Sequence, residues 1–174
     1  RQVKWLVENE KFPFSSIHWQ LNAGFWKNDY ARRDFANWSE KSYDPGIQRL
    51  TTFWVDQMEE KGIVLRLYPL LGVAQSILTN EKECLLRCGG GWINYAIQTN
   101  GCIVPCPTMW GMKDLYLGNI DTADPITLKK VFVKEPCATC SSSKLCGGRC
   151  LYTNVMKRWS PEAYHHVCKT VKNL

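Results

Sequence analysis

Cysteine placement constrains this chain more than any other feature of its sequence. The 174 residues include nine cysteines, and none of them lies in the first 83 residues. The count is odd, and we expect no signal peptide because residues 1–11 are charged and lack an apolar run. A disulfide scaffold is therefore poorly supported. Thiolates are soft ligands that suit zinc and iron–sulfur clusters, so we expect this region to bind metal.

The cysteines form two groups and one distant member. They are Cys84, Cys88, Cys102 and Cys106, then Cys137, Cys140, Cys146 and Cys150, and finally Cys168, with seventeen residues between the last two. Short gaps let neighbouring sulfurs face one metal centre, and a distant ligand then closes the site. Gly147 and Gly148 allow the backbone to turn tightly between two ligands, where a side chain would crowd a cluster.

The first 80 residues alternate predicted strands with a predicted helix. Residues 15–22 favour a strand. Within them Ile17, Trp19 and Leu21 alternate to one side, as in a half-buried strand. Residues 63–67 (IVLRL) favour a second strand, which leads into a Tyr-Pro pair. One helix between two strands, with short connections, indicates the βαβ unit of a parallel sheet.

The helix between these strands is predicted from signals at both of its ends. Asp44 is a candidate N-cap, and Pro45 suits the first helical position because no hydrogen-bond donor is needed there. Apolar residues three and four positions apart define one face, namely Ile47, Leu50, Trp54 and Met58. A glycine directly after Lys61 predicts the end of the helix.

The region after residue 80 reads as short elements and loops. Asn100-Gly101 predicts a two-residue hairpin turn between segments 92–99 and 102–105. Residues 125–133 predict a brief helix. Segment 137–150 (CATCSSSKLCGGRC) is predicted to be a loop, because almost none of its residues can build a core.

A final helix closes the chain. Ser160 is its predicted N-cap and Pro161 its first residue. Val167, Cys168 and Val171 share the apolar face of this helix. That face should point inward, and we therefore expect the sulfur of Cys168 to point toward the interior.

Charge and hydropathy exclude several classes of partner. The net charge is +6, but the basic residues are scattered, which is typical of a solvated surface rather than of a nucleic-acid site. No apolar run reaches the roughly 20 residues that a membrane-spanning helix needs. We therefore expect no nucleic-acid partner, no membrane association and a cytoplasmic location.

The order of seven cysteines and one glycine resembles the SPASM motif. That motif lies C-terminal to the catalytic barrel in radical S-adenosylmethionine enzymes that modify peptides and proteins. The residues that carry the match are Cys88, Gly101, Cys106, Cys137, Cys140, Cys146, Cys150 and Cys168. The segment 117–120 (LGNI), between the two groups, also resembles a segment typical of that family.

The resemblance implies two auxiliary 4Fe–4S clusters with interleaved ligands. It assigns Cys88, Cys106 and Cys150 to the first cluster. The second cluster would take Cys137, Cys140, Cys146 and Cys168. A further ligand of the first cluster would be Cys84, four residues before Cys88; the alternatives are Cys102 or an iron site left open for a substrate.

The same resemblance implies a domain organisation and a fold. Residues 1–80 would be the last βα units of a partial TIM-type barrel, an α/β fragment. Residues 81–174 would be a small, loop-rich α+β SPASM-like domain with a β-hairpin and iron–sulfur clusters. In this family the end of the second strand lies near the adenine of S-adenosylmethionine, which would bring Leu70 and Leu71 to that cofactor through backbone groups and apolar packing.

The resemblance also implies a substrate and a missing partner. The barrel's C-x3-C-x2-C motif is absent from the sequence, since residue 91, where Cys84 and Cys88 would require its third cysteine, is a glycine. We therefore expect this chain alone to be inactive, and its partners to be a peptide or protein substrate and an N-terminal radical half.

Two other functions use the same cysteines. A structural zinc protein would hold one ion with the four thiolates of segment 137–150. A ferredoxin-like electron carrier is the other alternative. Four more side chains have open roles: His165 and His166 beside Cys168 could tune a cluster, His18 could face a ligand, and Arg149 could shield cluster charge, or each could be structural.

Overall fold

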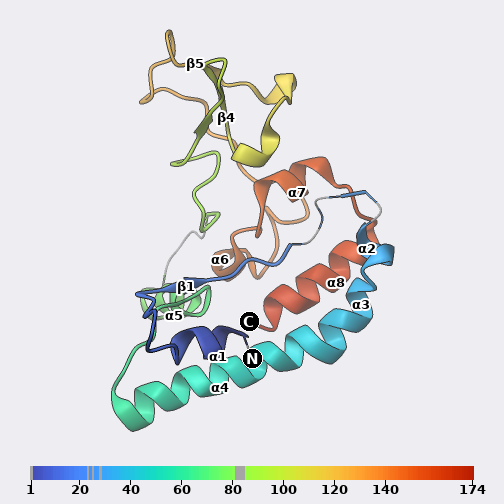
Figure 1. The fold of residues 1–174 in the computed structure, drawn as a ribbon. Helices are drawn as coiled ribbons and strands as arrows, with labels where there is room; N and C mark the ends of the chain where they lie inside the picture. The colour runs from blue at the N-terminus through green and yellow to red at the C-terminus, as the bar shows by residue number, and fades with distance from the viewer. Residues whose placement is uncertain (1, 23, 25, 28, 81–84) are drawn as a thin grey trace. The chain divides into compact units, whose positions relative to one another are not determined.

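The computed structural model describes residues 2–22, 24, 26, 27, 29–80 and 85–174. Within these the chain is an α/β structure with short sheets and several helices, and it divides into two compact units (Figure 1). Unit 1 comprises residues 1–80 and 158–174, and unit 2 comprises residues 81–157. The first boundary coincides with the change in composition near residue 80. The last helix belongs to unit 1 by its contacts.

Unit 1 is mainly helical around a two-stranded sheet. Its elements are α1 (Gln2–Val7), β1 (Ile17–His18), α2 (Asp29–Arg32), α3 (Phe35–Trp38), a π-helical turn (Ser39–Tyr43), α4 (Asp44–Lys61), β2 (Leu67–Tyr68), α5 (Leu70–Leu78) and α8 (Pro161–Lys172). β1 pairs with β2 in parallel, with Ile17 opposite Leu67. The βαβ unit is confirmed, although both strands are only two residues long, and β2 begins four residues later than predicted.

The apolar faces of α4 and β2 form the main core of unit 1. Trp54, Leu67 and Leu70 are buried together, and the predicted face of α4 is confirmed by Leu50 and Met58, which pack against them. The indole Nε1–H of Trp54 donates a hydrogen bond to the carbonyl of Leu65 at 2.8 Å. This hydrogen bond joins α4 to the segment that precedes β2.

The start of α4 differs from the prediction. Asp44 is not an N-cap, because helical backbone runs without a break from α3 through the π-helical turn into α4. The residue before it, Tyr43, has helical φ and ψ, and no side chain caps the helix there. The end is confirmed: Gly62 has φ +66° and its N–H closes the last turn.

The last helix, α8, packs against α3, where the continuous helical stretch that leads into α4 begins (Figure 1). Ser160 is its N-cap, as predicted, and its side chain accepts a hydrogen bond from the Ala163 N–H at 3.2 Å. Val167 is buried with Phe35 and Trp159. The orientation expected for Cys168 is wrong: its side chain is exposed, because the buried residues of α8 lie one position earlier in each turn.

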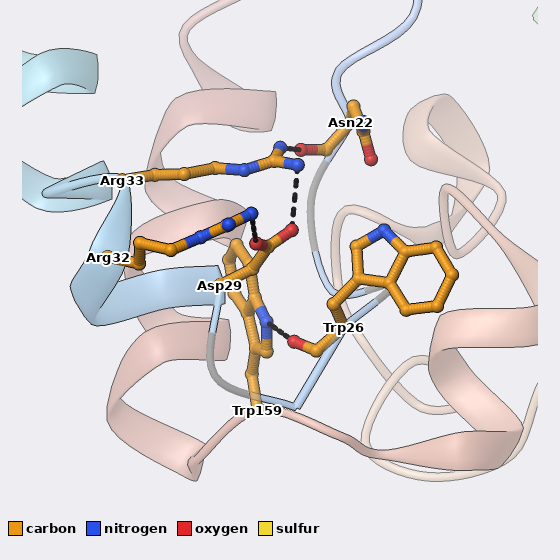
Figure 2. A network of polar contacts seen from close by, with 6 residues as sticks. All are labelled: Asn22, Trp26, Asp29, Arg32, Arg33 and Trp159. Atoms are coloured by element: carbon orange, nitrogen blue, oxygen red, sulfur yellow. Dashed lines mark hydrogen bonds and ion pairs between the residues drawn. The ribbon is translucent and has the colours of Figure 1, made fainter.

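A polar network fixes the chain before α2 (Figure 2). The buried carboxylate of Asp29 forms ion pairs with Arg32 at 2.8 Å and with Arg33 at 2.7 Å. Arg33 also donates to the carbonyl of Asn22 at 3.0 Å. The Trp159 indole donates to the carbonyl of Trp26 at 2.8 Å. These contacts link segment 22–33 to the residue before α8.

Unit 2 consists of a three-stranded antiparallel sheet, two short helices and long connections. Its elements are β3 (Ala96–Ile97), β4 (Cys102–Val104), two 3₁₀ turns (Pro107–Met109 and Lys113–Leu115), β5 (Gly118–Asn119), α6 (Ser143–Cys146) and α7 (Leu151–Met156). The hairpin between β3 and β4 is confirmed. Its turn differs from the prediction, because the Gly101 N–H bonds to the Gln98 carbonyl, which makes a loop of three residues.

The helix predicted over residues 125–133 is wrong. This segment has a turn followed by irregular chain, and Val131 donates its N–H to the carbonyl of Gly91 at 2.7 Å. Its apolar residues pack against neighbouring segments instead, as at Val133, which lies against Gly148. Elsewhere in unit 2, Val104, Met109 and Leu151 are fully buried. No helix among the described residues is long and apolar enough to span a bilayer.

Candidate metal centre

None of the eight described cysteines forms a disulfide. Seven of them are in unit 2, and Cys168 is in α8 of unit 1. Cys88 is exposed, and the other six in unit 2 are partly buried. Cys84, the ligand expected to complete the first cluster, lies outside the described residues. The thiols are thus chemically available as ligands, and none of the eight is committed to a cross-link.

Segment 137–150 is a chain of tight turns. The N–H of Cys140 bonds to the Cys137 carbonyl at 3.3 Å, and the N–H of Ser143 bonds to the Cys140 carbonyl at 2.9 Å. The single turn of α6 follows and ends at Cys146. Arg149 then closes a further turn onto the Cys146 carbonyl at 3.3 Å. These local bonds fold the loop back on itself, so that its cysteines do not extend away from one another.

Two glycines let this loop approach other parts of unit 2. Gly147 has φ +64°, and a Cβ there would overlap the Leu85 carbonyl oxygen and lie 2.9 Å from the Leu85 carbonyl carbon. Gly148 has φ +83°, and a Cβ there would lie 2.9 Å from Val133. The prediction that the backbone turns tightly between Cys146 and Cys150 is confirmed. Both glycines also allow close packing against neighbouring chain.

The thiol of Cys137 has a pKa that its surroundings shift. Burial raises the pKa of the Cys137 thiol, a hydrogen bond from Asn154 and the positive charge of Arg149 lower it, and the nearby Cys146 and Cys140 thiols raise it further. The net shift is upward, so the neutral thiol is favoured.

Helix α7 supports the loop through two buried polar side chains. Asn154 accepts from the Lys134 N–H at 2.6 Å and donates to the Lys134 carbonyl at 2.8 Å. Thr153 donates to the carbonyl of Cys150 at 3.2 Å and accepts from Arg149 at 2.8 Å. Sequence reasoning missed Thr153 and Asn154, because polar residues beside a cysteine loop give no signal of burial. It had named Arg149 without deciding its role.

The first group of cysteines is held in looser structure. A Cβ built at Gly90 would lie 3.5 Å from both the Cys88 sulfur and the Pro105 carbonyl, so these two segments meet at Gly90. The Cys106 sulfur contacts the Thr108 hydroxyl at 3.1 Å. Cys102 begins β4 opposite Asn119. The structure therefore brings Cys88 and the chain preceding Cys106 together.

The remaining candidates lie in unit 1. Leu70 is buried in the core and Leu71 is partly buried against it, both at the start of α5. His18 is on the exposed side of β1 and lies near Tyr68, with a ring separation of 6.4 Å. The rings of His166 and Tyr30 have centroids 6.1 Å apart, and His165 is exposed on α8. These positions are compatible with packing roles, and the S-adenosylmethionine contact stays a prediction.

The donor chemistry of these residues fits iron–sulfur clusters, but the described residues do not close a ligand set by themselves. Thiols are the donors that such clusters require, and four of them share the loop 137–150. No group of three or more metal-ligating side chains in the described part of the chain stands in the geometry of a metal-ion site. One of the expected ligands, Cys84, lies outside the described residues and therefore outside this test.

Comparisons with known proteins give one structural resemblance. No family model and no curated protein matches the chain. The chain is similar to native anSMEcpe with bound AdoMet, an anaerobic sulfatase-maturating enzyme, at 16% identity and a TM-score of 0.44, over 92% of this chain and 46% of that chain. For a histidine-tagged form with bound AdoMet, the identity is 17% and the TM-score is 0.40, over 92% of this chain and 44% of that chain. This chain spans less than half the length of either, and the scores are too low to carry a statement about function.

Proposed function

We propose that this chain is the C-terminal segment of a radical S-adenosylmethionine enzyme and that it binds two auxiliary 4Fe–4S clusters. One observation carries the proposal: seven cysteines and a glycine stand in SPASM order, and none of these cysteines forms a disulfide. When bound, the clusters would transfer single electrons or anchor a substrate side chain. The substrate class would be a peptide or protein.

The ligands of the second cluster are Cys137, Cys140, Cys146 and Cys168. The placement of the first three in one loop folded by local hydrogen bonds supports this set. The exposure of Cys168 also supports this set, because a sulfur buried in the core of unit 1 could not bind a cluster. What this chain contributes is a loop folded by its own hydrogen bonds, so that few residues need to be ordered when metal binds.

The ligands of the first cluster are Cys88, Cys106 and Cys150, completed by Cys84 or Cys102. The approach of the Cys88 sulfur and Pro105 at Gly90 supports the pairing of Cys88 with Cys106. The chain lacks the C-x3-C-x2-C motif, so the cluster that activates S-adenosylmethionine would belong to a separate N-terminal half. Leu70 and Leu71 would lie beside that cofactor in the whole enzyme.

The proposal is tested by metal analysis of the native chain and three variants, Cys146→Ala, Cys102→Ala and Cys84→Ala, each purified without oxygen. The native chain should contain about eight iron atoms and an equal amount of acid-labile sulfide, as two 4Fe–4S clusters require. Cys146→Ala should lose about four of these irons, because it removes one ligand of the second cluster only. Cys102→Ala is the matched control, and it should retain all the iron if Cys84 is the ligand.

Unchanged iron in Cys146→Ala would contradict the ligand assignment. Loss of iron in Cys102→Ala, with the iron of Cys84→Ala unchanged, would show that Cys102 and not Cys84 completes the first cluster. The zinc alternative is favoured by one observation, namely that Cys137, Cys140, Cys146 and Cys150 all belong to one loop of one unit. Colourless protein with stoichiometric zinc and no labile sulfide would establish that function instead.

A further inference from the structure

A hydroxyl group contacts one of the proposed ligand sulfurs in unit 2. The sulfur of Cys106 and the hydroxyl oxygen of Thr108 lie 3.1 Å apart, within hydrogen-bonding distance. Between a thiol and a hydroxyl, either group can be the donor. A cysteine that binds metal is a thiolate and has no proton to donate. If Cys106 ligates iron, the donor in this contact is therefore the Thr108 hydroxyl.

The backbone of this turn is held on both sides. Cys106 is extended, with φ −156° and ψ 142°, and directly precedes the 3₁₀ turn Pro107–Met109. Its carbonyl accepts a hydrogen bond from the Met109 N–H at 2.9 Å. Met109 and Pro105 are fully buried, and each proline ring fixes its own φ. The backbone positions of Cys106 and Thr108 are thus fixed relative to each other, and the β-branched threonine has few χ1 rotamers.

This turn lies where two proposed ligands of the first cluster approach each other. A Cβ built at Gly90 would lie 3.5 Å from both the Cys88 sulfur and the carbonyl oxygen of Pro105, the residue before Cys106 in the chain. The Thr108 side chain is exposed, whereas Cys106 is partly buried. An exposed hydroxyl contributes little to the stability of a fold, so the fold does not depend on this contact. The group on which the hydroxyl can act is the sulfur.

We propose that Thr108 is a positioning residue for the first cluster, whose hydroxyl donates a hydrogen bond to the ligating sulfur of Cys106. This inference rests on the proposed function. The bond fixes the orientation of that sulfur and places an O–H donor against the negative charge that the sulfur carries as a ligand. Thr108 itself binds neither iron nor substrate, and it acts only through Cys106.

The expected effect is on the reduction potential of the first cluster. Hydrogen bonds to the sulfurs are among the properties that set such potentials. Reduction adds negative charge to a cluster and its sulfurs, so an O–H donor stabilises the reduced form more than the oxidised form. Removal of the hydroxyl should therefore make the midpoint potential of the first cluster more negative and leave that of the second cluster unchanged.

Three variants separate the hydroxyl from the rest of the side chain. Thr108→Val keeps the branched shape and replaces the hydroxyl with a methyl group, whereas Thr108→Ser keeps the hydroxyl and removes the methyl group. Thr127→Val is the matched control, because Thr127 is an exposed threonine of the same unit whose hydroxyl donates to the Asp124 carbonyl at 3.4 Å. Only Thr108→Val should shift the potential.

The test is a redox titration of the anaerobic full chain, monitored by electron paramagnetic resonance, in which the first cluster gives the signal that Cys146→Ala retains. A negative shift in Thr108→Val, with native potentials in Thr108→Ser and Thr127→Val, supports the inference. A native potential in Thr108→Val with its iron retained overturns the inference and leaves the cluster proposal standing, and so does an equal shift in either other variant. A native chain without iron overturns the proposed function instead, so the two failures are distinguishable.

Iron content decides the question if Thr108→Val does not retain the first cluster. Loss of about four irons in Thr108→Val, with full iron in Thr108→Ser, supports the inference, because only the variant without the hydroxyl then fails to hold the cluster. Loss of the same iron in both variants overturns it, because the hydroxyl that Thr108→Ser keeps would then not be what the cluster requires.

Discussion

Gly147 offers a stringent test of how closely the cysteine loop packs. Its φ of +64° lies in the left-handed region, and a Cβ there would overlap the Leu85 carbonyl oxygen and lie 3.2 Å from the Leu86 Cα. The atoms it would meet are backbone and cannot rotate away. Gly111 is a matched control in the same unit, since its φ is +74° but nothing lies within 4 Å of its Cβ position.

The two substitutions separate conformational cost from overlap. At either site, alanine in the left-handed region costs about 1 kcal/mol. At Gly147 the overlap with fixed backbone adds about 1–3 kcal/mol, the usual cost of overpacking. We therefore expect Gly147→Ala to lower the free energy of unfolding of unit 2 by about 2–4 kcal/mol, and Gly111→Ala by about 1 kcal/mol.

The assay is equilibrium urea unfolding of the anaerobic full chain, followed by far-ultraviolet circular dichroism. Amide hydrogen exchange at residues 85–86 and 147–150 locates the loss in unit 2. Equal losses in the two variants would refute the reasoning, because they would show that residue 147 does not approach Leu85. A larger loss in Gly111→Ala would have the same consequence.

Three further predictions concern unit 1. The phenol oxygen of Tyr43 accepts a hydrogen bond from the Trp19 indole at 3.2 Å, and burial raises the pKa of this phenol above 10.0. The free energy of unfolding should therefore fall as pH rises beyond 10.0, because the unfolded state loses the proton first. Urea titrations repeated at several pH values should show a shallower fall for Tyr43→Phe. Ser160→Ala should lower the melting temperature, since loss of an N-cap costs about 1 kcal/mol, whereas Ser160→Asp should not. Asp29→Ala should destabilise unit 1 by about 1–2 kcal/mol, because the buried carboxylate loses its bonds to two arginines that are exposed enough to be solvated in its absence; an unchanged urea midpoint would contradict this.

Sequence patterns that act over a few residues predicted the structure well. The apolar face of α4, the glycine at its end, the Ser160 cap and the β3–β4 hairpin each depend on neighbours within a few positions. Local chemistry decides such features, so the sequence contains them directly. The parallel pairing of β1 and β2 also followed, because one helix between two strands leaves few topologies.

Features decided by tertiary packing were not predictable. Asp44 has the chemistry of a cap, but the preceding residues are helical because Phe35 is buried against α8, and the helix therefore begins earlier. Residues 125–133 do not form the predicted helix, and the Val131 N–H bonds instead to the carbonyl of Gly91 in another segment. Cys168 shares the helical period of the buried face only approximately, and its side chain is exposed.

The candidate site shows the same division. The order of the cysteines was readable, and so was the need for glycine at positions 147 and 148. The structural role of Asn154 was not, because its two hydrogen bonds to Lys134 join residues 20 positions apart and depend on how α7 packs. Cluster ligation itself is a convergence of distant segments, which spacing alone suggests but does not determine.

The central claim is that these thiols hold iron. Diffraction from anaerobically grown crystals, measured on both sides of the iron absorption edge, tests it most directly. The account predicts two strong anomalous peaks, one bonded to the sulfurs of Cys137, Cys140, Cys146 and Cys168, and the other bonded to those of Cys88, Cys106 and Cys150. Peaks only at the zinc edge, or continuous density joining pairs of these sulfurs as disulfides, would contradict it.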